Sequence, residues 1–211
     1  MTIPTLYHCP DARSFRVLWM LEELGTDYRL ELLPFPPRVR ARDYLELNPL
    51  GTIPLFLEGD ARMTESAAIC HYLATTRGDG SLAVAPEEAG YAAYLDALSF
   101  GEATLTFPQT LVLRYALFEP KERRLPQVAD DYRVWYLARL RGLEAMLEAG
   151  DYVAGDRFTA ADISVGYALM LAEFARIGNG ESPVVASYWQ RLRERPAFLR
   201  AKVAQKREIA A

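Results

Sequence analysis

The segment Asn48–Leu73 limits the possible folds of this chain more than any other. Two turn dipeptides, Asn48-Pro49 and Leu50-Gly51, lead there into Ile53-Pro54. A residue before proline favours an extended conformation, and an X-Pro bond can be cis at a cost of only about 0.5–1 kcal/mol. With a cis bond, the N–H and C=O of Ile53 would face outward, and an extended peptide ligand could pair with them as an added strand.

The second half of this segment places polar residues at the start of a helix. Residues 55–57 are apolar and predict a strand, a turn follows, and Thr64-Glu65-Ser66 precedes a helical pattern. A helix N-terminus has unpaired N–H groups and a positive dipole end, so it attracts a carboxylate. Ser66 can donate to that carboxylate and Glu65 can accept from an ammonium, which suits an α-amino-acid group. The same residues also fit a second interpretation, in which Thr64 and Ser66 only cap the helix.

Together the two halves resemble the glutathione-binding signature of the cytosolic glutathione transferases. The likeness lies in Asn-Pro-x-Gly-x-Ile-Pro at 48–54, followed by Glu-Ser-x-Ala-Ile-x-x-Tyr-Leu at 65–73. It implies an α/β thioredoxin-like N-terminal domain with a cis-proline at Pro54 and an all-α C-terminal domain. It also implies that glutathione is bound as a substrate, with contacts from Thr52, Ile53, Pro54, Glu65 and Ser66.

The likeness extends over almost the whole chain. Residues 14–19, 152–163 and 195–198 are similar to the first helix, the capping-box region and the C-terminal end of the same family. Within the family, the chain resembles a group of bacterial and fungal transferases that includes a yeast enzyme, and residues 9–12 also resemble the Cys-Pro run of the omega class. The resemblance implies a homodimer.

Composition excludes several other classes of partner. The chain has 211 residues, of which 51% are hydrophobic and 25% charged, enough for a packed core in one or two domains. The net charge of −4 is spread without a basic block, so nucleic acid is not an expected partner. No apolar run approaches the roughly 20 residues that cross a bilayer, and residues 1–4 lack the charged start of a signal peptide.

Cysteine and histidine are both rare in this chain. Cys9 and Cys70 predict reduced thiols rather than a disulfide framework. His8 and His71 are too few for a metal site unless the fold gathers them with the two cysteines. We therefore expect a cytoplasmic protein without a metal, nucleic-acid or membrane partner.

The elements before residue 77 predict a small α/β domain. Thr5–His8 and Tyr28–Leu33 predict strands, and the apolar face of residues 14–24 predicts a helix between them. This order implies a parallel pair of strands joined by a right-handed crossover, and the turn after Pro54 adds an antiparallel hairpin. The prolines at 34–37 argue against regular structure there, and a short helix is expected at 43–47.

The remainder of the chain has a helical pattern. We expect a glutathione-binding domain at 1–77, a linker at 78–88, and an all-helical domain at 89–211 that carries the hydrophobic substrate site. Pro108 should kink or break the first long helix, and a capping box is predicted at residues 159–162. Further helix boundaries are expected at Ser182-Pro183 and Arg195-Pro196, before a charged tail from Lys202 that should fray.

Three residues are candidates for activating the thiol of glutathione. Relatives with a Ser-Arg-Ser-Phe-Arg run carry a serine where this chain has Ala12, so the usual hydroxyl donor is missing. Ser14 at the start of the first helix can donate, or can serve as a plain helix cap. Tyr7 ends the first strand, where tyrosine-type transferases carry their hydroxyl, or can be a packing residue. Cys9 precedes a helix N-terminus that would lower its pKa, or can be a small buried turn residue.

The sequence thus leaves three functions open. The first is conjugation of the glutathione thiolate to a small hydrophobic electrophile, with the second substrate against Phe107, Leu111 and Tyr115 between the domains. The second is thiol transfer or reduction through Cys9, and the third is a glutathione-binding protein without catalytic activity. Basic residues at 38, 40 and 42 can reach the glycyl carboxylate of glutathione or can form a solvated face.

Overall fold

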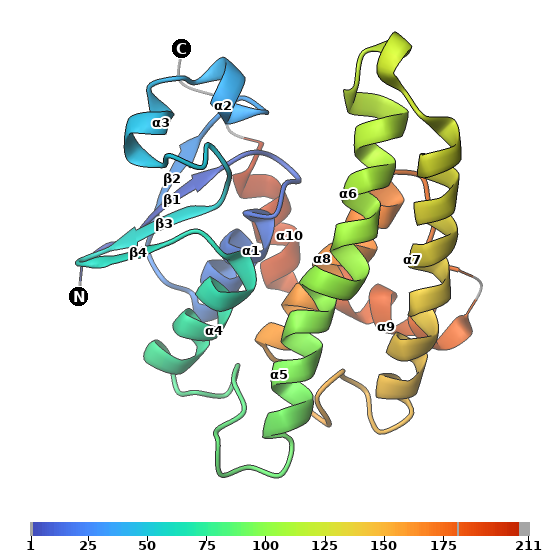
Figure 1. Ribbon diagram of the computed structural model, residues 1–211. Coiled ribbons are helices and arrows are strands. Elements are labelled where there is room, and N and C mark those ends of the chain that lie inside the picture. The colour runs from blue at the N-terminus through green and yellow to red at the C-terminus, as the bar shows by residue number, and fades with distance from the viewer. Residues whose placement is uncertain (1, 181, 207–211) are drawn as a thin grey trace. The chain divides into compact units, whose positions relative to one another are not determined.

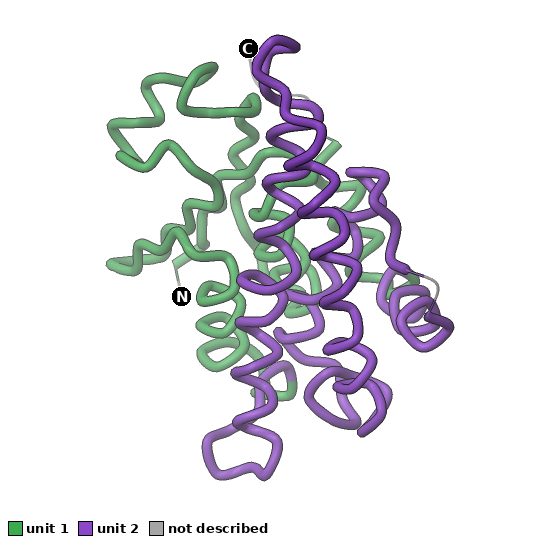
Figure 2. Tube along the Cα trace, turned by 45° about the vertical axis from the view of Figure 1, so that its right-hand side comes forward, with its two compact units in different colours: residues 1–81, 194–211 green, residues 82–193 purple. Residues whose placement is uncertain are grey.

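The computed structural model describes residues 2–180 and 182–206. The chain divides into two compact units, which Figure 2 shows in separate colours. Unit 1 comprises residues 1–81 and 194–211, and unit 2 comprises residues 82–193.

Unit 1 is built on a four-stranded mixed sheet in the order β2-β1-β3-β4 (Figure 1). Its strands are β1 (Thr5–His8), β2 (Arg29–Leu32), β3 (Leu55–Glu58) and β4 (Ala61–Met63). β1 pairs in parallel with β2 and antiparallel with β3, and β3 and β4 form a hairpin. The predicted parallel pair and the predicted hairpin are therefore confirmed.

Helices pack on both faces of this sheet. The helices of unit 1 are α1 (Phe15–Leu24), α2 (Pro37–Arg40), α3 (Tyr44–Leu47), α4 (Ser66–Thr76) and α10 (Pro196–Ala204). α1 contacts both α4 and α10. Successive side chains of a strand point to opposite faces. His8 at the end of β1 accordingly meets Gln205, the C-cap residue of α10, whereas Tyr7 meets Tyr44 of α3 on the other face.

Two parts of unit 1 differ from the sequence prediction. Residues 34–36 are not helical, but a short helix, α2, begins at Pro37, where a missing N–H leaves no intrahelical bond unmade. At the C-terminal end, Lys202 lies inside α10 rather than in a fraying tail. By its contacts α10 belongs to unit 1, and not to the helical domain that was expected to run to residue 211. Fraying of residues 207–211 lies outside the described residues.

Unit 2 is helical. Its elements are α5 (Tyr91–Ser99), η1 (Phe100–Thr106), α6 (Phe107–Leu113), η2 (Arg114–Phe118), η3 (Lys121–Arg123), α7 (Pro126–Leu147), α8 (Ala160–Phe174) and α9 (Pro183–Arg193). α8 is buried along most of its length, and α5, η1 and α9 all pack against it. Pro183 begins α9, as expected from the Ser182-Pro183 dipeptide.

The chain does not break at Pro108, in contrast to one of the two predicted outcomes. Helical structure continues from α5 through η1 into α6, and η1 is a π-helix. Pro108 then lies in the first turn of α6. A π-helical stretch changes the backbone hydrogen-bond pattern and so accommodates a residue that lacks an N–H donor.

The predicted capping box is present at the start of α8. The Thr159 hydroxyl accepts from the N–H of Ala161 at 3.3 Å, and Asp162 accepts from the N–H of Thr159 at 2.8 Å. Asp162 also accepts from the N–H of Val153 at 3.0 Å and from the Tyr188 hydroxyl at 2.9 Å. The box therefore stabilises the start of α8, as the sequence indicated.

Candidate functional site

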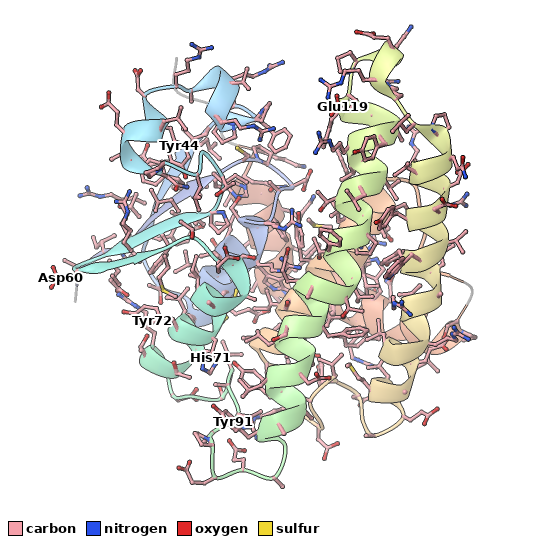
Figure 3. The ribbon with its side chains drawn as sticks, viewed as in Figure 1. Tyr44, Asp60, His71, Tyr72, Tyr91 and Glu119 are labelled. Carbon is pink, nitrogen blue, oxygen red and sulfur yellow. The ribbon has the colours of Figure 1, made fainter. Side chains whose placement is uncertain are left out.

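The loop before β3 is fixed by hydrogen bonds to a single carbonyl group. The carbonyl oxygen of Thr52 accepts from the Asn48 side-chain amide at 2.8 Å and from the Tyr44 hydroxyl at 2.7 Å; Figure 3 labels Tyr44 beside α3. Gly51 has φ +60°, and a Cβ atom there would lie 2.6 Å from Cβ of Arg38, so only glycine fits. The loop holds Ile53 at a defined position.

The Ile53-Pro54 bond is cis, as the family resemblance of residues 48–54 and 65–73 implied. The Ile53 side chain is anchored in an apolar cluster with Cys9, Tyr44 and Leu55. Within residues 2–180 and 182–206, the N–H and C=O of Ile53 make no hydrogen bond with the protein. This backbone can therefore pair with an extended peptide ligand.

Ser66 is the first residue of α4 and does not cap that helix. The N-cap residue is Glu65, without a side-chain capping bond, so the interpretation of Ser66 as a cap is wrong. Ser66 Oγ lies 3.1 Å from Nη1 of Arg16, a fully buried residue of α1. Because arginine has only donors, Ser66 accepts this bond and keeps its own proton for another acceptor.

The start of α4 therefore combines three features that favour a carboxylate. These are the positive end of the helix dipole, the Ser66 hydroxyl and the buried guanidinium of Arg16. Glu65 is exposed and offers a negative charge to an ammonium group. Thr52 is also exposed, whereas Pro54 is buried beside Ile53.

Cys9 is fully buried in the apolar cluster around Ile53. Burial raises the pKa of its thiol to about 12, so the thiol is protonated and weakly nucleophilic at neutral pH. The expectation of a lowered pKa is therefore wrong in direction, because the loss of hydration disfavours the thiolate. Cys70 is also fully buried, and burial raises the pKa of its thiol to about 12.

The Ser14 hydroxyl takes part in internal hydrogen bonds. Ser14 occupies the N-cap position of α1 but its side chain makes no capping bond. Its Oγ lies 2.7 Å from Nδ1 of His8 and accepts from the N–H of Cys9 at 3.3 Å. Ser14 and His8 are both fully buried. Burial lowers the pKa of His8 to about 4, so its ring is neutral at neutral pH.

Tyr7 differs from the other two thiol-activating candidates in exposure. Its side chain is partly exposed and its ring lies 5.5 Å from the ring of Tyr44. It packs against the cluster that contains Ile53. In the part of the chain that the structure describes, the Tyr7 hydroxyl makes no hydrogen bond, and it is available to a ligand.

The residues expected to meet the second substrate all lie in unit 2. Phe107 begins α6 and is 54% exposed, Leu111 is partly exposed in the same helix, and Tyr115 is partly exposed in η2. The Arg114 guanidinium lies 5.4 Å from the centre of the Tyr115 ring. In unit 1 the basic residues at 38, 40 and 42 are exposed.

One residue beside the candidate site could not be identified from the sequence. Gln205, the C-cap residue of α10, is buried and contacts His8, although the two are 197 positions apart. No local pattern marks such a pair, because only the tertiary fold brings the chain ends together. Among the described residues, no helix could cross a membrane, and no group of three or more His, Cys, Asp or Glu side chains is placed to bind a metal.

Comparison with known proteins identifies the family of this chain. Residues 9–76 match the family model described as the glutathione S-transferase N-terminal domain. Glutathione S-transferase 4 of Zea mays is 33% identical over 201 residues, which cover 90% of this chain and 86% of the maize protein. The chain belongs to the glutathione S-transferase family. The cis-proline loop and the start of α4 thus lie in the segment that the family model covers.

Solved glutathione transferases share the whole fold. The transferase from Methylococcus capsulatus is 25% identical, with a TM-score of 0.83, and the match covers 96% of this chain and 98% of that one. A glutathione transferase from Phanerochaete chrysosporium, solved in complex with oxidized glutathione, is 26% identical with a TM-score of 0.82 over 97% and 96% of the two chains. The predicted architecture of a thioredoxin-like domain followed by a helical domain is confirmed.

Proposed function

We propose that this glutathione S-transferase family member conjugates glutathione to a small hydrophobic electrophile. The observation that carries the proposal is the pairing of two ligand features in unit 1. One is the Ile53 backbone at the cis-proline, and the other is the carboxylate-binding start of α4 at Ser66. A γ-glutamyl tripeptide has an extended backbone and one terminal α-amino-acid group, so it can use both features at once.

In the proposed reaction, glutathione first loses its thiol proton to solvent. The thiolate electron pair then forms a carbon–sulfur bond with the electrophile. For a halogenated substrate, the carbon–halogen bond breaks and the halide leaves with its electron pair, so atoms and charge balance. The protein must favour the thiolate over the thiol, by a hydroxyl donor and by the positive end of α1.

Tyr7 is the hydroxyl donor that we favour. Its ring packs against the cluster that contains Ile53, and its hydroxyl is not committed to a partner in the described part of the chain. The Ser14 hydroxyl is buried and bonded to His8, which counts against Ser14 as a donor. The electrophile would meet Phe107, Leu111 and Tyr115, whose rings and alkyl groups suit an aromatic or halogenated compound.

The two alternative functions receive unequal support. Thiol transfer through Cys9 needs an accessible thiolate, and a buried thiol with a raised pKa does not provide one. A glutathione-binding protein without catalysis stays open, because Ala12 stands where relatives have a serine. We also infer, from family membership, a cytoplasmic homodimer, which sedimentation analysis of the purified chain checks.

Calorimetric titration with glutathione tests the binding half of this proposal. Ser66→Ala removes the hydroxyl at the start of α4, so we expect at least about tenfold weaker binding than in the unmodified chain. Ser99→Ala is the matched control, since Ser99 is exposed and bonds only to its own helix at Leu95. If the unmodified chain did not bind glutathione at all, the proposed function would have to be abandoned.

The catalytic half is tested on Tyr7→Phe with an activated chloroaromatic electrophile. We expect about a hundredfold loss of kcat/KM with little change in glutathione affinity, because the variant lacks only the donor. Binding without measurable conjugation in the unmodified chain, over a panel of electrophiles, would favour the non-catalytic alternative.

A further inference from the structure

A network of buried and partly buried polar groups connects the C-terminal end of α10 to the turn that precedes α1. His8 lies between two partners, with Nδ1 2.7 Å from Ser14 Oγ and Nε2 3.2 Å from Gln205 Oε1. Gln205 Nε2 donates to Asp11 Oδ1 at 2.7 Å, and the N–H of Asp11 donates back to Gln205 Oε1 at 3.0 Å. Gln205 therefore binds the end of β1 and the middle of the turn at once.

Lys202 adds a positive charge to this polar network. Its ammonium group donates to Asp11 Oδ1 at 2.6 Å and lies 5.5 Å from the centre of the Phe15 ring. Burial acts to raise the pKa of Asp11, but the hydrogen bonds from Lys202 and Gln205 outweigh it and lower that pKa. Asp11 has φ +55°, a conformation that residues other than glycine rarely adopt. The contacts with α10 thus hold the turn in a conformation that the local backbone does not favour.

The donor and the acceptor of each hydrogen bond in this polar network can be assigned. The Asp11 carboxylate needs a donor, so the amide nitrogen of Gln205 faces it, and the amide oxygen faces the N–H of Asp11. The same amide oxygen lies 3.2 Å from Nε2 of His8 and can only accept, so Nε2 carries the ring proton and donates it. A neutral ring then has a lone pair on Nδ1, which accepts the hydroxyl proton of Ser14. The Ser14 proton therefore faces His8 Nδ1 at 2.7 Å, which is closer than its other acceptor, the Cys9 carbonyl oxygen at 3.5 Å, and both acceptors belong to the protein.

The remainder of α10 is anchored on α1, so its position is well defined. The Phe198 ring contacts the rings of Phe15 and Trp19, with centroids 5.5 and 4.9 Å away. The Arg195 guanidinium makes two hydrogen bonds to the Glu23 carboxylate, at 2.6 and 2.9 Å. A helix fixed in this way can act as a rigid support for the turn.

We propose that Gln205 and Lys202 are positioning residues, which hold the turn at residues 9–13 so that the start of α1 faces the thiol of bound glutathione. The inference rests on the proposed function, because it assigns these residues to the glutathione site. Neither residue touches the thiol. They act through His8 and Asp11, and the loss of either residue leaves the contacts at Ile53 and Ser66 in place.

The test measures the thiol of bound glutathione directly, without a second substrate. Ultraviolet absorbance of the thiolate, followed across pH, gives the pKa of the bound thiol. In Gln205→Met and Lys202→Met we expect this pKa to rise by about one unit, which is about tenfold less thiolate at neutral pH. Glutathione affinity, measured in parallel by calorimetry, should change by less than about threefold.

Arg200→Met is the matched control on the same helix. Arg200 bonds Glu22 of α1 at 2.8 Å and does not contact the turn, so this variant should keep the thiol pKa of the unmodified chain. Variants at 202 and 205 that bind glutathione with an unchanged thiol pKa would overturn the proposal. An equal rise in the control would overturn it too, since α10 would then act only as a support for α1. Lys202 is partly exposed, so Lys202→Met decides the matter if Gln205→Met does not fold.

A second measurement separates this inference from the proposed function. If the unmodified chain does not bind glutathione, the proposed function fails, and amide hydrogen exchange of residues 9–13 then tests the positioning alone. We expect exchange at least about tenfold faster in Gln205→Met than in the unmodified chain and in Arg200→Met. Equal exchange in all three proteins would refute the positioning role.

Discussion

At the residue scale, unit 1 contains ionisable side chains whose protonation states are set by their surroundings. His8 is the clearest case, because it is fully buried between Ser14 and Gln205 and one of its nitrogens must accept. Burial lowers the pKa of His8 to about 4, from about 6.5 in an unfolded chain. A protonated ring would have no acceptor for the Ser14 hydroxyl and would place a second donor against it.

This shift predicts a loss of stability in mild acid. Between pH 6.5 and 4 the unfolded chain binds a proton at His8 that the folded chain does not, so stability falls as the pH falls. We expect His8 to account for about 3 kcal/mol of this loss in the free energy of unfolding. Urea unfolding at a series of pH values measures it, and the slope should be reduced in His8→Asn.

His71 provides the control for this measurement. It is partly exposed, whereas His8 is fully buried, and burial lowers the pKa of both rings. The exposed part of its ring stays hydrated, so His71→Asn should retain most of the pH dependence. A pH slope that is the same in His8→Asn as in the unmodified chain would show that His8 is protonated normally in the folded state.

At the element scale, α8 depends on the carboxylate of Asp162. Burial raises the pKa of Asp162 to about 6, and four hydrogen bonds oppose that rise, so the group is ionised above neutral pH. All four bonds come from donors, namely the N–H groups of Val153 and Thr159 and the hydroxyls of Thr159 and Tyr188. The side chain thus connects the start of α8 with α9 and with the segment before the box.

An isosteric substitution tests this arrangement. Asp162→Asn keeps the shape but turns an amide nitrogen toward groups that also donate, so we expect about 3 kcal/mol lower stability at pH 8. Asp131→Asn, at an exposed position on α7, should change stability by less than about 0.5 kcal/mol. The measurement is the urea-unfolding midpoint followed by far-ultraviolet circular dichroism. Equal stability of the two variants would contradict the role given to the Asp162 carboxylate.

At the scale of the whole molecule, the chain returns to its first unit after completing the second. Figure 1 shows α10 beside α1, and Figure 2 gives the two segments the same colour. The apolar contact at this point is Phe198 against Phe15 and Trp19, and all three side chains are buried. Stability of unit 1 therefore depends on residues that follow unit 2 in the sequence.

Truncation of Phe198 tests this division. Phe198→Ala removes a buried ring from unit 1 and should cost about 3–5 kcal/mol. Hydrogen exchange should become faster in β1 and α1 and stay unchanged in α8, since α8 belongs to unit 2. Phe174→Ala, at a 55% exposed position, is the control and should leave both patterns unchanged. Faster exchange confined to unit 2 would show that α10 belongs with the helical unit.

Much of this protein was predictable because the signals are local. Turn dipeptides and a proline placed the loop at Ile53, spacing predicted the strands of the sheet, and residues 159–162 predicted a capping box, which the structure confirms. Motif order was enough to identify the family. Each of these signals depends on the conformational preferences and short-range hydrogen bonds of a few neighbouring residues.

The tertiary structure decided whatever depends on burial or on contacts between distant residues. The position of Cys9 before a helix suggested a reactive thiolate, but burial raises the pKa of that thiol. The sequence indicated that the Ser14 hydroxyl could donate to a ligand, but in the structure this hydroxyl is hydrogen-bonded to the ring of His8. Only the return of the chain through α10 places Gln205 beside that ring. Solvation and long-range pairing arise when the chain packs, so the sequence determined the family and the fold, and the packed structure determined the burial and the hydrogen bonds of each candidate group.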